Sequence, residues 1–331
     1  MAKKKKKRKS KKHNSKKPRS PIFALLSVIV SVVAGLVLFV VVTTHDFADV
    51  ATWTVRIFNT IAEFVGADTY IPLPGQGEAI VHFIDVGQGD AVLIHTAEGS
   101  VLIDGGDNHM GERVVSYLRR LGIREITYVV ATHPHSDHIG GLIDVLYAFP
   151  VGTLIMPPIA HTTLTFEHFL DAIESNNITL QEPIAGSSFG IGGATFTVIA
   201  PNSSGYSNIN DYSVSLRMTF GVTSFIFTGD AEAASEAEMV EAGHVLSSNV
   251  LHLGHHGSTT STTQPFLNAV NPEIAVISVG ASNGHGHPHR AVINRLNAAG
   301  TRIYRTDRHG NVVVSTNGAD LTVLTVRGTR R

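Results

Sequence analysis

Short apolar runs that end abruptly in Gly, His or Asp recur after residue 78, and this pattern constrains the fold most. Each run has about three to six apolar or β-branched residues, the length of a short buried strand. The runs and the polar clusters that end them are VHFIDVGQGD from Val81, VLIDGGD from Val101, TYVVATHPHSDH from Thr127, SFIFTGD from Ser224, NVLHLGHHGS from Asn249 and IAVISVG from Ile274.

Helical segments are expected between several of these strands, which predicts an α/β fold with sheets covered by helices. The expected helices are Gly111 to Leu121, Leu142 to Phe149, Phe166 to Ser175, Ala231 to Ala242 and His289 to Ala299. Functional groups in such folds gather on loops at one edge of the sheets. We therefore expect the polar clusters to share that edge.

The first 43 residues carry a topology signal. Residues 1–20 hold 12 of the 26 Lys and Arg residues and no acidic residue. The rest of the chain therefore has 14 basic and 27 acidic residues, which gives it a formal charge of −13. Residues 21–43 are apolar and without charge, which predicts one transmembrane helix. The positive-inside rule then predicts a single-pass protein of the cell membrane, with a cytoplasmic N-terminus and the remaining chain outside. A cleaved signal peptide is the alternative, although this run is longer than the apolar part of such peptides.

Residues 44–77 connect this span to the soluble domain. Apolar residues recur at spacings of three and four from Phe47 to Val65, which predicts a juxtamembrane helix with one apolar stripe. Two prolines and two glycines lie between Pro72 and Gly77, a composition that suits neither helix nor strand. We therefore predict a linker there and a soluble domain over residues 78–331.

The chain has no cysteine and 18 histidines. Disulfides, thiolate metal sites and cysteine nucleophiles are therefore excluded. Any transition metal must be held by imidazole and carboxylate groups.

Three imidazoles and a carboxylate lie within the segment HPHSDH, from His133 to His138, directly after an apolar run. Side chains two apart in an extended segment point the same way, so His133 and His135 can hold one cation while Asp137 and His138 face another position. Burial of such groups without a ligand is costly, and zinc favours His with Asp. We therefore predict that all four bind metal.

HPHSDH resembles the H-x-H-x-D-H signature of the metallo-β-lactamase superfamily, whose members stack two β-sheets between helices and place two metals at the sheet edge. In the family's order, Asp104 in LIDGG resembles its early structural Asp, Asp230 in FTGD its bridging carboxylate, and His255 in LGHHGS its last metal-binding His. The resemblance implies an αββα four-layer metallo-β-lactamase fold over residues 78–331, preceded by the one transmembrane helix. It also implies two divalent metal ions, zinc or manganese.

Within that superfamily, three segments are similar to the hydrolase domain of ComEC-type competence proteins. They are IDVGQGDAVLI from Ile84, HHGS from His255 and GHP from Gly286. Those proteins carry many membrane helices for DNA passage, whereas one is expected here, so a role in DNA uptake is not carried over. The resemblance at GHP implies that His287 binds the substrate or transfers a proton.

The ligand set of the first metal site stays open. The superfamily's usual third His would fall near residues 210–213, where this chain has none. His161 and His168 lie in segments expected to be loop and helix. Either Asp211 supplies a ligand, or the first site is weaker and takes a harder ion such as manganese.

His255 and His256 are adjacent, and because neighbouring side chains diverge we expect only one to bind metal, namely His255. Asp85 and Asp90 in DVGQGD are expected to satisfy buried backbone amides rather than to bind metal. The histidines expected to be structural or exposed are His82, His95, His109, His244, His252 and His309.

A metal pair lowers the pKa of bound water to about 7 and offsets charge on the attacked group. We therefore predict a membrane-anchored hydrolase that uses a metal-bound hydroxide, with Asp137 orienting the water and Asp230 bridging the ions. The resemblance implies a phosphodiester substrate, DNA included, and hence a phosphodiesterase or nuclease. The charge of −13 beyond residue 20 repels long nucleic acid, which leaves small phosphoesters of the cell envelope open. The alternative from another class is a non-catalytic binding module with an incomplete first metal site.

Overall fold

The structure, a computed structural model, describes residues 72–326. These residues lie in one of the two units into which the chain divides, Ile71–Arg331. Within residues 72–77 there is neither helix nor strand. Among the described residues, no helix has the length and apolarity needed to cross a membrane. The basic segment 1–20, the predicted span 21–43 and the predicted juxtamembrane helix lie outside the described residues.

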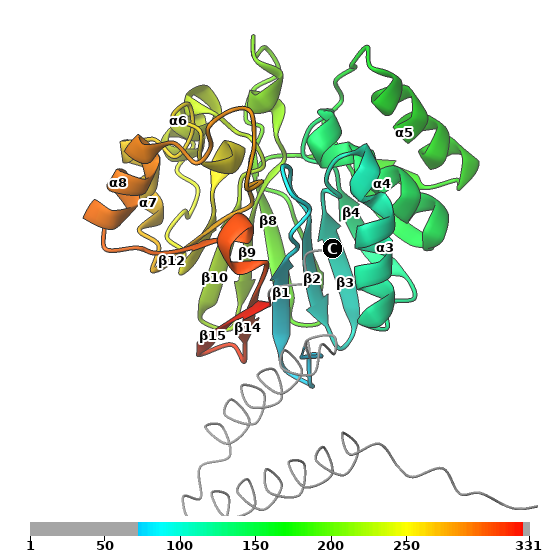
Figure 1. Cartoon of the computed structure of the whole chain (residues 1–331), viewed down its shortest axis with the longest axis horizontal. Helices are drawn as coiled ribbons and strands as arrows, with labels where there is room; N and C mark the ends of the chain where they lie inside the picture. The colour runs from blue at the N-terminus through cyan, green and yellow to red at the C-terminus, as the bar shows by residue number, and fades with distance from the viewer. Residues whose placement is uncertain (1–71, 327–331) are drawn as a thin grey trace, which may run out of the picture. The chain divides into compact units, whose positions relative to one another are not determined.

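Two β-sheets are stacked between helices (Figure 1). The first sheet has eight strands in the order β15-β14-β1-β2-β3-β4-β5-β6. These strands are β1 (Ala79–Phe83), β2 (Val92–Thr96), β3 (Gly99–Ile103), β4 (Ile126–Val130), β5 (Val151–Ile155), β6 (Thr179–Gln181), β14 (Asn311–Thr316) and β15 (Leu321–Val326). The pairs from β3 to β6 are parallel and the others are antiparallel.

The second sheet has seven strands in the order β13-β12-β11-β10-β9-β8-β7. They are β7 (Ser188–Ile191), β8 (Ala194–Ala200), β9 (Ser215–Phe220), β10 (Thr223–Phe227), β11 (Val250–His252), β12 (Ile274–Ile277) and β13 (Arg302–Arg305). The strands from β10 to β13 run parallel. Each sheet thus has a parallel part whose carboxyl ends meet at one edge.

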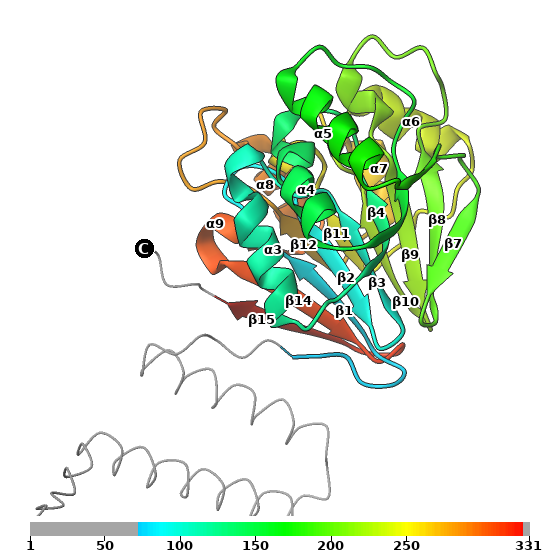
Figure 2. The same ribbon diagram turned by 90° about the vertical axis from the view of Figure 1, so that its right-hand side faces the viewer.

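Helices cover the outer face of each sheet, so the layering that the family resemblance implies is confirmed. Those that cover the first sheet are α3 (Gly111–Arg120), α4 (Ser136–Ala148) and α5 (Leu164–Ser175), which Figure 2 shows in front of its strands. Those that cover the second sheet are α6 (Ala233–Glu241), α7 (Gln264–Val270) and α8 (Arg290–Ala298). The shorter turns are α9 (Thr306–His309), η1 (Asn108–Met110), η2 (Ile209–Tyr212) and η3 (Gly254–Gly257).

Three apolar layers hold these elements together, one between the sheets and one beneath each set of helices. Alternation along β1 sends Val81 and Phe83 into the layer between the sheets, as the two-residue period of a strand requires. On α3, Val114 and Leu118 are four residues apart and both fully buried. Each large apolar side chain removed from water in this way stabilises the fold by roughly 1.5–3 kcal/mol.

Helix α4 begins at Ser136, earlier than the predicted start at Leu142, because two glycines are packing residues rather than helix breakers. The Gly141 N–H donates to the Gly106 carbonyl oxygen at 2.8 Å. A Cβ atom on Gly141 would overlap the Gly105 carbonyl oxygen, and one on Gly140 would overlap the backbone of Asn108. The first turns of α4 therefore lie directly against the loop that follows β3.

Replacement of Gly141 by Ala should destabilise the fold by about 1–3 kcal/mol, the cost typical of overpacking. The loop at Gly105 offers backbone rather than a flexible side chain, so it has little freedom to yield. Urea unfolding of the full chain measures the change. Gly205→Ala is the matched control, because no atom lies within 4 Å of a Cβ placed there. Equal stability of the two variants would contradict close packing at α4.

Candidate metal centre

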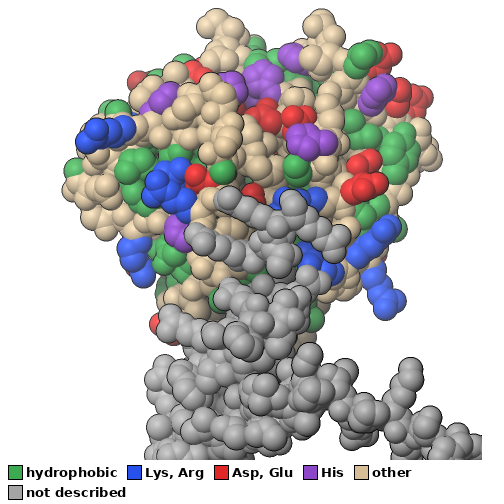
Figure 3. Space-filling view, in the orientation of Figure 1, with side chains coloured by type: hydrophobic (Ala, Val, Ile, Leu, Met, Phe, Trp, Pro, Cys, Tyr) green, Lys and Arg blue, Asp and Glu red, His purple; other side chains and the backbone are tan. Residues whose placement is uncertain are grey.

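The polar clusters meet where the strands of both sheets end. The HPHSDH segment follows β4 and runs into the first turn of α4, Asp230 follows β10, and His255 and His256 follow β11. Carboxyl ends of parallel strands at one edge are the usual place for ligands in α/β folds. Figure 3 shows histidine side chains beside acidic ones at this edge.

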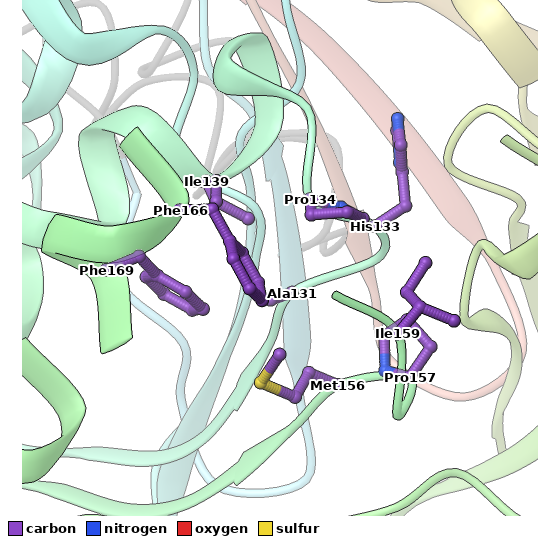
Figure 4. Close-up of a pocket in the computed structure, with 9 residues that line it drawn as sticks. All are labelled: Ala131, His133, Pro134, Ile139, Met156, Pro157, Ile159, Phe166 and Phe169. Atoms are coloured by element: carbon purple, nitrogen blue, oxygen red, sulfur yellow. The ribbon is translucent and has the colours of Figure 1, made fainter. Parts of the chain in front are cut away.

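The HPHSDH loop is fixed from behind by apolar contacts. Pro134 shares a crevice with Ile139 of α4, Ile159 of the β5–α5 loop and Phe166 of α5, and the crevice leaves no room for water. Figure 4 shows the His133 side chain directed away from the phenylalanine rings of this crevice. Packing of Pro134 therefore holds the neighbouring histidines at the edge of the sheets.

One group of donor atoms consists of His133 and His135, of which His133 reaches one oxygen of Asp230. The His133 Nε2 atom is 2.9 Å from the His135 Nδ1 atom and 3.8 Å from Asp230 Oδ2. These are the two histidines that the sequence assigns to one cation. Both lie on the loop after β4, and His133 is buried whereas His135 is partly exposed.

A second group lies around the other oxygen of Asp230. The distances from Asp230 Oδ1 are 3.3 Å to His138 Nε2 and 3.6 Å to His256 Nε2. The Oδ2 atom of Asp137 is 3.3 Å from His256 Nε2 and 3.9 Å from His138 Nε2. Asp230 thus lies between two sets of donors, as a bridging carboxylate would.

Buried donor atoms without partners test whether these residues fit a metal ion. The Nε2 atoms of His138 and His256 and the Oδ1 atom of Asp230 are buried and have no hydrogen-bond partner among the described residues. Unpaired buried polar atoms are rare, because each costs free energy. Imidazole nitrogen with carboxylate oxygen is a donor set that zinc accepts. The residues on the Oδ1 side of Asp230 therefore fit a divalent cation.

The outward-facing ring nitrogens have partners of their own. Asp104 Oδ2 lies 2.8 Å from His138 Nδ1. The Ser278 carbonyl oxygen lies 3.0 Å from His256 Nδ1, and Asp90 Oδ1 lies 3.3 Å from the same nitrogen. Such pairs fix the ring so that Nε2 faces the metal. Asp104 also accepts from the Thr132 backbone N–H at 2.9 Å, which ties it to the strand end.

Asp90 differs from its predicted role. Asp85 accepts from the Gly87 backbone N–H at 3.1 Å, as expected for this loop. The side chain of Asp90, however, faces the imidazoles of His256 and His252, at 3.3 and 3.7 Å. The sequence gives no signal for this, because the partner imidazoles lie more than 150 positions away along the chain.

Charge is concentrated in this group. Burial acts to lower the pKa of His138, yet the surrounding carboxylates, Asp230 first, together raise it well above its usual value. Burial is likewise outweighed at His256, whose pKa is raised well above the usual value by Asp230 and Asp90. Burial tends to raise the pKa of Asp230, but His138 and His256 hold it well below its usual range. The carboxylates therefore favour the protonated form of both imidazoles when no metal is bound.

The two adjacent histidines differ from the prediction that only His255 reaches the centre. His256 is buried and belongs to the group with Asp137 and His138. The His255 side chain is 23% exposed, and its Nε2 atom lies 3.7 Å from Asp230 Oδ2. Both residues have left-handed backbone, with φ of 49° and 55°. This rare conformation turns both rings towards Asp230, which the sequence does not reveal.

The remaining predicted positions lie around this centre. Asp211 accepts from the backbone N–H groups of Glu232 and Ser235, at 3.0 and 3.2 Å, so it caps α6 instead of joining the donor groups. The His161 ring lies 5.7 Å from that of His135, whereas His168 is exposed on α5.

His287 lies on the loop before α8, beside the centre. Its ring is 5.4 Å from the ring of His255 and 6.4 Å from the ring of His256. Burial first, and then the neighbouring imidazoles, lower the pKa of His287 to about 4. His287 thus lies beside the centre, with a ring that is neutral at pH 7.

Comparison with known proteins agrees with this geometry. The model of the Metallo-beta-lactamase superfamily matches residues 84–281. The chain belongs to this superfamily. ComE operon protein 3 of Bacillus subtilis is 31% identical over 73% of this chain and 33% of its own length. Competence protein ComA of Neisseria gonorrhoeae is 34% identical over 71% of this chain and 32% of its own length.

These relatives are ComEC-type competence proteins, and the chain spans about a third of the length of the curated relatives it matches. Among solved structures, a metallo-β-lactamase fold protein of Bacillus subtilis has a TM-score of 0.50 at 11% identity, over 72% of this chain and all of its own. That likeness supports the fold alone. Membership of the superfamily implies binding of divalent metal.

Metal affinity should rise with pH between 6 and 8. The raised pKa values of His138 and His256 mean that a cation must displace their protons, and such displacement becomes easier as the proton concentration falls. Titration of the metal-free full chain with Zn²⁺ at pH 6, 7 and 8 measures this. Calorimetry in two buffers of different ionisation enthalpy should show proton release. An affinity that falls with pH would refute the protonated state.

Proposed function

We propose that this chain is a membrane-anchored, metal-dependent phosphodiesterase. The observation that carries the proposal is the convergence of buried imidazole and carboxylate atoms on Asp230. Of these atoms, Asp230 Oδ1 and the Nε2 atoms of His138 and His256 have no hydrogen-bond partner among the described residues. Bound divalent ions would supply an activated water and offset negative charge on the attacked group. The anchor is the apolar segment 21–43, whose sequence supports one membrane span.

Asp137 is suited to orient the attacking water. One of its oxygens lies 3.3 Å from His256 Nε2, while its side chain is 30% exposed. It therefore reaches both the buried donors and the open side of the centre. Its backbone oxygen accepts from the Asp90 N–H at 3.1 Å, which fixes the start of α4 and with it the side chain.

His287 is proposed to bind a phosphate oxygen. A neutral ring, as the lowered pKa implies, donates a single N–H to an anion without repelling a metal. Protonation of the leaving group, the other role expected for this residue, requires a proton that its ring does not hold near pH 7. The lowered pKa of His287 therefore favours substrate binding over acid catalysis.

The phosphodiester class is supported by the relatives. Two carry names that refer to competence, and a third, 31% identical over 71% of this chain and 28% of its own length, is named Recombination protein 2 of Haemophilus influenzae. Such names concern nucleic acid, whose linkages are phosphodiesters. Because this chain spans about a third of those proteins, we propose the bond that is cleaved and not a part in DNA uptake.

Loss of a donor at either oxygen of Asp230 should abolish hydrolysis. We expect His135→Ala and Asp230→Ala to lower turnover of bis(p-nitrophenyl) phosphate by on the order of 10³-fold, since metals contribute several kcal/mol to such reactions. His168→Ala, an exposed imidazole of α5, is the matched control and should retain full activity. If the wild-type chain binds metal but shows no turnover with zinc, manganese or magnesium, the proposal is contradicted and the chain is a non-catalytic binding module.

DNA contacts should be confined to the metal centre. The chain beyond residue 20 has a formal charge of −13, so it offers few cations to a long polyanion. The logarithm of the affinity for single-stranded DNA should fall as the logarithm of salt concentration rises, with a slope shallower than about −2. Such a slope corresponds to the neutralisation of no more than about three phosphates. Binding of a variant that lacks the basic residues 1–20 to immobilised oligonucleotides at several salt concentrations measures the slope. A slope of about −5 or steeper would instead indicate an extended nucleic-acid groove.

A further inference from the structure

The two donor groups around Asp230 are unequal. On the Oδ1 side lie two buried imidazoles and the carboxylate of Asp137, whereas on the Oδ2 side the HPHSDH loop supplies His133 and His135 alone. Residues 210–213, where the superfamily's third His would fall, contribute no imidazole. If both sides hold a cation, as the proposed function requires, the Oδ2 side needs a further donor.

His255 lies on this poorer side. Its Nε2 atom is 3.7 Å from Asp230 Oδ2, the oxygen that is 3.8 Å from His133 Nε2. The neighbouring ring of His256 faces Asp230 Oδ1 instead, at 3.6 Å. The two consecutive left-handed residues thus direct adjacent rings to opposite oxygens of one carboxylate.

Glu232 supports His255 as other carboxylates support the buried histidines. Its Oε1 atom lies 3.0 Å from His255 Nδ1, and the Thr260 hydroxyl lies 3.2 Å from the same nitrogen. An oxygen partner on Nδ1 leaves the lone pair of Nε2 free to bind a metal. Asp104 with His138 forms the same arrangement on the other side. There the Nδ1 atom of His256 likewise faces oxygen atoms, those of the Ser278 carbonyl and of Asp90.

The segment that lacks the third His holds Glu232 in place. The Asn210 side-chain amide donates to Glu232 Oε1 at 3.0 Å. Asp211 Oδ1 accepts from the Glu232 backbone N–H at 3.0 Å. Residues 210 and 211 therefore influence the Oδ2 side indirectly, because they hold Glu232, which in turn holds His255.

We infer that His255 and His256 bind different metal ions. His255 completes the first site with His133, His135 and Asp230, while His256 belongs to the second site, and Glu232 is the positioning residue for His255. The rival donor is His161, whose ring is 5.7 Å from that of His135 but which no described contact links to Asp230. This inference rests on the proposed two-metal centre and adds the ligand set of its first site.

Metal binding by the full-length chain tests the inference without reference to turnover. Metal-free wild-type protein and its variants are titrated with Co²⁺, followed by visible absorption, and with Zn²⁺ against a chelator. His255→Ala should weaken one of two sites by at least about 100-fold and leave the other unchanged, and free imidazole should restore the lost equivalent. Glu232→Gln should weaken that same site by about 10–100-fold, the usual effect of losing an outer carboxylate.

Two further variants fix the assignment. His256→Ala should remove the site that His255→Ala retains, so the Co²⁺ spectra of the two single-site proteins should differ. His161→Ala should bind two equivalents with wild-type affinity. The inference fails if His255→Ala still binds two ions as wild type does, if His161→Ala loses one, or if wild type binds fewer than two. If two ions bind but no phosphodiester is hydrolysed, the proposed function is contradicted and the ligand assignment is not.

Discussion

The centre depends on one buried carboxylate placed between imidazoles from both sheets. Asp230 is 3% exposed, and a carboxylate so deeply buried is stable only when paired or bound to a cation. Its position after β10 brings it to the loop after β4 of the other sheet and to the pair after β11. Removal of its charge would take away a carboxylate that stabilises the protonated rings of His138 and His256. The stacking of the two sheets and the chemistry of the centre are therefore coupled through Asp230.

The strand ends were predictable from the sequence because burial imposes an apolar run and chemistry imposes polar residues directly after it. The run before Asp230 and the run before HPHSDH are β10 and β4, and their side chains meet as expected. The backbone at His255 and His256 was not predictable, because left-handed residues other than glycine carry no reliable signature. The role of Asp90 was also hidden, since its partner is set by the packing of one sheet on the other. The local sequence pattern thus identified the loops that carry the site. The packing of the two sheets determined which side-chain atoms face each other.

Rigidity of the centre comes from backbone contacts. Gly89 has φ of 122°, and a Cβ there would overlap the Asp137 carbonyl oxygen, so the loop after β1 lies directly against the start of α4. Gly141 gives the loop after β3 the same close approach. Side chains on either glycine would push the helix and its ligands outward. A site at strand ends and at a closely packed helix N-terminus holds its donor atoms more precisely than a site on flexible loops.

The proposed substrate is an anion, although the chain beyond residue 20 is acidic. The acidic groups of the centre other than Asp137 resolve this conflict, because they face imidazoles and not solvent. Asp90, Asp104 and Asp230 are all buried, and each lies within 4 Å of a histidine ring nitrogen. The open side is formed instead by the more exposed imidazoles of His255 and His287. Buried carboxylates can therefore hold cations in place while His287 offers an N–H group to the proposed phosphate, which favours a small anionic group over an extended polyanion.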